Sequence, residues 1–186
     1  PTFAGLAPNT YTLTVRSTAD NTCITAAAAT VTLTAATPPA VPTTSSVTQP
    51  TCAVPTGTIV FTAQAGVEYS VGGAYQASPT FAGLAPNTYT LTVRSTADNT
   101  CITAAAATVT LTAATPPAVP TTSSVTQPTC AVPTGTIVFT AQAGVEYSVG
   151  GAYQASPTFA GLAPNTYTLT VRSTADNTCI TAAAAT

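Results

Sequence analysis

The chain repeats itself without change, and this constrains its fold more than any other feature. The segment that begins at Pro1 returns at Pro79 and again at Pro157, which sets a period of 78 residues with no substitution between copies. That period is longer than the roughly 20–50 residues of solenoid repeats, and it is long enough for one small domain with its own core. The chain starts and stops inside the unit, so we expect it to be part of a longer array.

A proline-rich stretch marks the boundary between units, at residues 37–42 and again at residues 115–120. Three prolines within five residues favour an extended polyproline II spacer, which is semi-rigid. Division at this stretch predicts three parts. Residues 1–37 are the C-terminal part of an immunoglobulin-like module, residues 38–115 are a complete module, and residues 116–186 are a module that lacks its last strand.

Within one unit, short segments of alternating apolar and polar residues are separated by turn residues. This spacing is typical of a β-sandwich, and no stretch of ten or more residues carries helical periodicity. The predicted fold class is therefore all-β, with tandem immunoglobulin-like, Greek-key sandwich modules joined by proline-rich linkers. The predicted strands cover residues 45–49, 58–62, 67–71, 74–76, 89–94 and 108–112, with Phe81 and Leu84 as further apolar positions.

The segment before Tyr89 contains Leu84 and Pro86, which is the pattern of a tyrosine corner. In that motif the tyrosine hydroxyl bonds back to the backbone and fixes the crossover between sheets. A tyrosine that only caps the core is the alternative. The repeat places the same residue at Tyr11 and Tyr167.

Two segments of the unit resemble a known repeat family. They are residues 68–76, EYSVGGAYQ, and residues 81–93, FAGLAPNTYTLTV, and the opening Pro50-Thr51-Cys52 and the late Cys101 are similar too. Together they resemble the SprB-type repeats of giant Bacteroidota surface adhesins, although Asn87 stands where glycine is expected. The resemblance implies export through the type IX secretion system, attachment at the cell surface, and a role in adhesion or gliding.

Cysteine recurs twice in each unit, and paired thiols in a small exported module with a small core indicate disulfides. Pairing inside one module is the first expectation. A bridge from the first cysteine of one module to the second cysteine of the next, or of another chain, stays open, and so do free thiols. The candidate disulfide cysteines are Cys52, Cys101, Cys130 and Cys179, while Cys23 has no upstream mate.

Charge is nearly absent, and this excludes several classes of function. Each unit has one Glu, one Arg and one Asp, which are Glu68, Arg94 and Asp98 in the complete copy, and the chain has no Lys and no His. No catalytic triad or Cys-His pair can form, so we predict no enzyme, no cofactor and no metal site. We also predict no nucleic-acid partner and no membrane span. Asp98 is expected in an Asx turn rather than at calcium, and Glu68 and Arg94 in a cross-strand pair.

These features predict a structural region of an extracellular, cell-surface filament or adhesin stalk. Its partners are neighbouring copies of itself, joined head to tail and with lateral contact between chains also open. The alternative is a multivalent module that binds a ligand or surface glycans, with avidity supplied by the array. In that case Tyr75 and Tyr153 are the candidate surface contacts.

Overall fold

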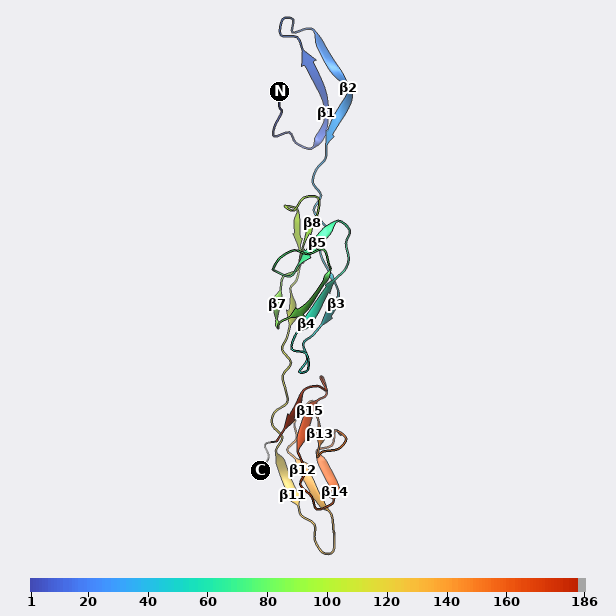
Figure 1. The fold of residues 1–186 in the computed structure, drawn as a ribbon, viewed down its shortest axis with the longest axis vertical. Coiled ribbons are helices and arrows are strands. Elements are labelled where there is room, and N and C mark those ends of the chain that lie inside the picture. Colours follow the sequence, from blue (N-terminus) through green and yellow to red (C-terminus); the bar gives the residue numbers. More distant parts are fainter. Residues whose placement is uncertain (184–186) are drawn as a thin grey trace.

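The computed structural model describes residues 1–183, which form sixteen strands and no helix, and which run as an end-to-end row (Figure 1). The all-β prediction is confirmed. Strands pair only within three segments, and we call these the N-terminal hairpin (residues 1–37), the middle module (38–115) and the C-terminal module (116–183). The last residues of the predicted third part, 184–186, lie outside the described residues.

The middle module is a sandwich of two antiparallel layers. The first layer has the order β3-β4-β6 and the second β5-β8-β9, and β7 pairs with β10 at the far end of the β8–β9 hairpin. In this module β3, β4 and β6 lie in one layer, and β5, β8 and β9 lie in the other. This is the arrangement of an immunoglobulin-like sandwich. The strands are β3 (Thr44–Thr48), β4 (Gly57–Phe61), β5 (Val67–Ser70), β6 (Thr80–Leu84), β7 (Asn87–Tyr89), β8 (Thr92–Ser95), β9 (Ile102–Ala104) and β10 (Val109–Leu111).

The core of the middle module consists of the inward positions of these alternating strands. The Phe61 ring packs against the rings of Tyr69 and Phe81, with centroids 5.1 and 5.6 Å apart. Tilted aromatic pairs at such distances stabilise beyond their buried area. The fully buried apolar residues are Ile59, Phe61, Tyr69, Leu91, Val93 and Leu111.

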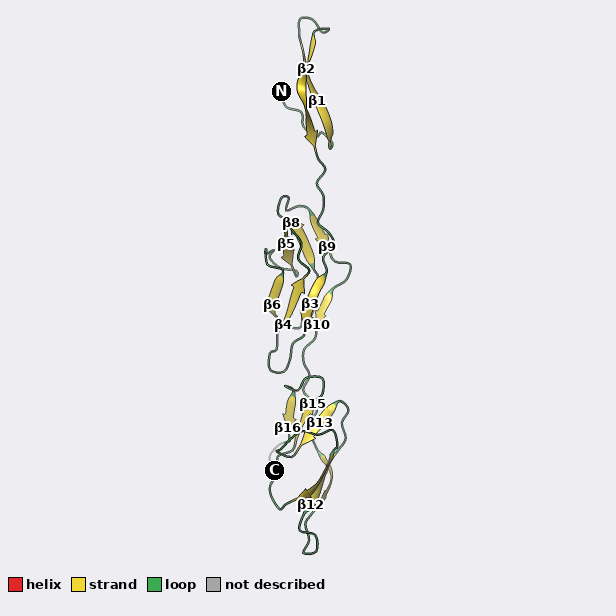
Figure 2. Ribbon diagram, turned by 90° about the vertical axis from the view of Figure 1, so that its right-hand side faces the viewer, coloured by secondary structure: helices red, strands yellow, loops and turns green. Residues whose placement is uncertain are grey.

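The other two segments show how much of the sandwich each retains (Figure 2). The C-terminal module repeats both three-stranded sheets, with the orders β11-β12-β14 and β13-β15-β16, and the N-terminal hairpin has only the pair β1–β2. Their strands are β1 (Asn9–Arg16), β2 (Ile24–Leu33), β11 (Thr122–Thr126), β12 (Gly135–Phe139), β13 (Val145–Ser148), β14 (Thr158–Leu162), β15 (Thr170–Ser173) and β16 (Ile180–Ala182).

The predicted strand at residues 89–94 is divided in the middle module, where β7 ends at Tyr89 and β8 begins at Thr92. The break has a counterpart in the facing strand, where the alanine run after β9 bulges out of the ladder. The amide of Ala105 still donates to the carbonyl of Leu91 across the break, at 2.8 Å. Strand β9 was not predicted, because its three residues carry too little alternation to be recognised.

The Tyr89 hydroxyl donates to the carbonyl of Ala85 at 2.7 Å, which is the bond of a tyrosine corner. Tyr11 and Tyr167 make the same bond to the residue four positions earlier, at 2.7 and 2.8 Å. This contact therefore fixes the entry to the fifth strand of the unit in each copy.

Residues 1–183 contain no helix of the length and apolarity needed to cross a membrane.

Candidate functional site: the junction between two modules

The opening loop, residues 49–56 between β3 and β4, lies at the end of the middle module that faces the next module (Figure 1). It is a tight turn, because the amide of Thr51 donates to the carbonyl of Val54 at 2.8 Å and the Thr51 hydroxyl accepts the Val54 amide at 3.0 Å. These bonds leave the amides of Cys52 and Ala53 directed away from the loop, available to a partner.

The late loop of the C-terminal module, residues 174–179 between β15 and β16, lies at the end that faces the middle module. The Asp176 carboxylate accepts the amide of Thr178 at 3.0 Å and its hydroxyl at 2.6 Å, which is an Asx turn. Asp98 makes the same bonds to Thr100, at 2.9 and 2.7 Å. The expected Asx turn is therefore present.

A disulfide joins the two loops across the junction. It links Cys52 to Cys179, 127 residues away, with their Cα atoms 5.0 Å apart. Two hydrogen bonds accompany it: the Cys52 amide donates to Asp176 Oδ2 at 2.9 Å, and the Ala53 amide donates to Thr178 Oγ1 at 3.2 Å. The opening loop is thus held to the late loop by the disulfide and by hydrogen bonds from the amides of Cys52 and Ala53.

This pairing differs from the first expectation, in which Cys52 pairs with Cys101 and Cys130 with Cys179. The opening loop and the late loop of one module lie at opposite ends of the sandwich (Figure 1), and Cys101 and Cys130 are not bonded to the other cysteine of their own module. The bridge to the next module, which the sequence left open, is the one that forms. Cys23, Cys101 and Cys130 are free thiols within the described chain.

The carboxylate of Asp176 is the electrostatic centre of the junction. Hydrogen bonds from the Thr178 hydroxyl, the Cys52 amide and the Thr178 amide lower its pKa below the usual 3.8, because each favours the charged form. Asp176 also lies close to the sulfurs of Cys52 and Cys179. Those sulfurs are oxidised, so the group offers a metal ion one carboxylate and no thiolate.

The linker is tied down on both sides of the junction. On the middle-module side, Gln49 Oε1 accepts the amide of Thr112 at 2.9 Å and its Nε2 donates to the carbonyl of Thr110 at 3.1 Å. On the other side, the Thr181 hydroxyl donates to the carbonyl of Pro117 at 2.8 Å. Only residues 113–116 of the linker lie between these two sets of hydrogen bonds. The disulfide joins the two modules across the same short stretch.

The contacts that fix the linker were not predicted. Gln142 Nε2 donates to the carbonyl of Ala118 at 3.3 Å, and in the preceding copy Gln64 and Thr103 hold Ala40 and Pro39 in the same way. In the sequence these are ordinary polar residues near strand ends. The only signal available was the proline stretch itself, because an extended polyproline II segment makes no internal hydrogen bonds and its carbonyls are left to accept from such side chains.

The candidate ligand contact Tyr75 lies on the outer face of the second sheet. The Arg94 guanidinium stands over its ring, 4.4 Å from the centroid, and bonds to Glu68 at 2.7 Å, so the expected cross-strand pair is present. The Tyr75 hydroxyl bonds to Thr92 Oγ1 at 3.1 Å. Tyr153 has the same cation partner in Arg172, also at 4.4 Å. One ring face of each tyrosine is therefore covered by its own module.

No model of a known protein family matches the chain, and a search of the curated proteins found no match.

Proposed function

We propose that this chain is a structural region of an extracellular filament or adhesin stalk, in which modules are joined head to tail into a stiff rod. The observation that carries the proposal is the Cys52–Cys179 disulfide between consecutive modules. A bond inside one module would stabilise that module alone. A bond between modules restricts how they move against each other, which is what a rod requires.

The remaining junction contacts support the same function. Gln49 and Thr181 shorten the free linker to residues 113–116, and a docked polyproline segment resists bending. The near absence of charge also leaves little repulsion to keep neighbouring rods apart, so lateral contact between chains fits the same surface.

An extracellular location at the cell surface is part of the proposal. Disulfides persist in oxidising compartments and are rare in the cytosol, so the bridge favours export. The resemblance to SprB-type repeats suggests the type IX route and a Bacteroidota source. We also propose that the region has no catalytic role, since its 186 residues contain no His and no Lys.

Ligand or glycan binding is the weaker candidate. Flat stacking on a sugar needs an open aromatic face, and Arg94 covers one face of Tyr75 while Thr92 holds its hydroxyl. No contact in the described chain favours this alternative.

Small-angle X-ray scattering of the purified chain tests the rod. We expect an extended particle with a module spacing of roughly 25–35 Å plus the linker, as the extended span from the start of β7 at Asn87 to the end of β8 at Ser95 implies at about 3.3 Å per residue. Cys52→Ser should broaden the distance distribution, because it frees the junction. Cys130→Ser removes an exposed free thiol and is the matched control, so it should leave the scattering unchanged. A compact particle, or a Cys52→Ser profile identical to that of the parent, would contradict the proposal.

A further inference from the structure

The repeat places both halves of the Cys52–Cys179 junction at other positions in the chain. Cys130 occupies the opening loop of the C-terminal module, and Cys101 and Cys23 occupy late loops, all with sequences identical to those of the bonded pair. Their thiols are free in the described chain. Each free cysteine therefore lies in a copy of one of the two loops that the Cys52–Cys179 bond joins, and its own partner loop is missing from the described chain.

The unpaired opening loop already has the shape of the paired one. Around Cys130, the amide of Thr129 donates to the carbonyl of Val132 at 2.7 Å, and the Thr129 hydroxyl accepts the Val132 amide at 3.1 Å. The corresponding bonds around Cys52 are 2.8 and 3.0 Å. Docking therefore requires no refolding of this loop.

The unpaired late loops are also preformed. The Asx turn of Asp20 bonds the Thr22 amide at 2.9 Å and its hydroxyl at 2.6 Å, the same contacts that Asp176 makes to Thr178 in the bonded copy. A preorganised loop loses little conformational entropy when it docks.

Docking changes the exposure of these residues in a consistent way. Cys179 is 1% exposed in the junction, whereas Cys101, in the late loop of a module that also has both sheets, is half-buried. On the other side, Cys52 is half-buried and its copy Cys130 is exposed. The free loops thus present surface that a neighbouring copy covers at the observed junction.

We propose that this opening-loop to late-loop bond recurs at each junction of the array, so that Cys130 bonds the late-loop cysteine of the next unit in the same chain. By the same register, Cys101 bonds the opening-loop cysteine of the preceding unit. In this connectivity each cysteine takes part in one disulfide, and one disulfide joins each pair of consecutive modules. It deepens the proposed function, on which it rests, by naming the partner of each end.

The bond forms by a balanced oxidation. The Cys130 thiol and its partner each lose one proton and one electron as their sulfurs join. The two electrons and two protons pass to a disulfide oxidant such as glutathione disulfide, which leaves as two glutathione thiols.

Counting thiols tests the connectivity without mapping identical peptides. The folded chain is oxidised with glutathione disulfide, denatured, alkylated and weighed intact. We expect one protein disulfide and three cysteines outside it, each of which is alkylated or carries one glutathione, because Cys23, Cys101 and Cys130 have no partner in this chain. Pairing within modules would give two disulfides and one thiol, and would overturn the proposal.

Recurrence is tested by appending one further copy of residues 109–186. The proposal expects a monomer with two disulfides and still three thiols, since the added unit supplies a partner for Cys130. One disulfide and five thiols, three disulfides and one thiol, or a disulfide-linked dimer would each overturn it.

Two variants of the extended chain control for folding. Cys130→Ser should leave one disulfide and four thiols, and Cys23→Ser should leave two disulfides and two thiols, with circular dichroism unchanged in both. The count depends only on connectivity. If the particle is a rod and the count is wrong, this inference is overturned and the proposed function stands. If the count is as expected and the particle is compact, the proposed function is overturned and the connectivity stands.

Discussion

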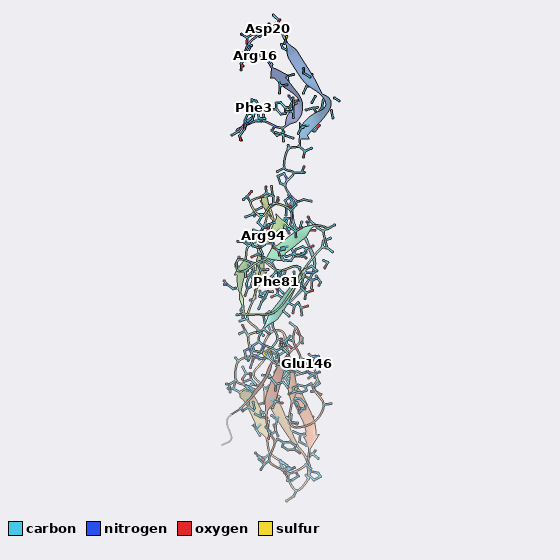
Figure 3. The ribbon with its side chains drawn as sticks, turned by 45° about the horizontal axis from the view of Figure 1, so that its top comes forward. Phe3, Arg16, Asp20, Phe81, Arg94 and Glu146 are labelled. Atoms are coloured by element: carbon cyan, nitrogen blue, oxygen red, sulfur yellow. A yellow bond between two sulfur atoms is a disulfide. The ribbon has the colours of Figure 1, made fainter. Side chains whose placement is uncertain are left out.

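Residues 1–37 and residues 79–115 have the same sequence and different surroundings. In the middle module Leu91 and Val93 are 2% and 0% exposed, whereas the same residues in the N-terminal hairpin, Leu13 and Val15, are 49% and 71% exposed. Phe81 lies among the strands of its module, and Phe3 extends beside β1 and is 74% exposed (Figure 3). Identical residues are thus core in one copy and surface in the other.

The pairing of the two strands does not change between these copies. In the hairpin Tyr11 faces Val31 and Val15 faces Thr25, and in the middle module Tyr89 faces Val109 and Val93 faces Thr103. Strand register is therefore set by the hairpin itself. Burial is set by the strands β3, β4 and β6, which supply the opposing layer that the N-terminal hairpin lacks in this chain.

Truncating one buried leucine in each copy should break this comparison most strongly. We expect Leu91→Ala to destabilise the middle module by about 2–5 kcal/mol, because it removes a buried side chain and leaves a cavity. Leu13→Ala is the matched control at the same position of the repeat, and it should change the unfolding of the middle module by less than about 0.5 kcal/mol. Calorimetry of the middle-module transition measures both.

Equal effects of the two leucine substitutions would contradict the comparison. They would mean that the hairpin in residues 1–37 is packed as tightly as its copy, or that Leu91 does not contribute to the core.

The fold was largely predictable because its signals are local. Alternation placed Ile59 and Phe61 inside, and the turn before Tyr89 marked the corner. What escaped prediction was the bulge at the alanine run, which divides a strand that reads as continuous. Alanine carries no strong preference for a face, so the sequence does not show where the ladder is interrupted.

The candidate site was only partly predictable, because it is built between units. The cysteines were recognised, but which of them pair depends on which end of the sandwich each loop occupies. The roles of Gln49 and Asp176 depend on the approach of a second module. A repeat sequence cannot distinguish a contact within one copy from a contact with the next, since both have the same period.

A smaller effect is expected at the tyrosine corner. Tyr89→Phe removes the bond to Ala85 and should destabilise the middle module by about 1 kcal/mol, the net value of one such hydrogen bond. Tyr11→Phe removes the same bond from the hairpin and should leave the middle-module transition unchanged. Urea denaturation of the two variants compares them. A Tyr89→Phe variant as stable as the parent would show that the corner does not stabilise the module.

The smallest expected effect is a response of the junction to acid. The pKa of Asp176 is lowered in the folded chain, so the stabilisation it brings is complete above the usual value of 3.8 and is lost as the pH falls through the lower, folded pKa. The junction should therefore be insensitive to pH between about 5 and 8 and should weaken only below about 4.

Selective ¹⁵N labelling of cysteine makes this response visible, because the five cysteine amides give five signals. The Cys52 amide bonds to the Asp176 carboxylate, and we expect its signal to shift most below about pH 4. Cys130, the same position of the repeat outside a junction, should shift least. Asp176→Asn should abolish the titration of the Cys52 signal, and Asp98→Asn should not affect it. A Cys130 signal that shifts as far as that of Cys52 would show that the acid response arises within the opening loop and not from the contact between modules.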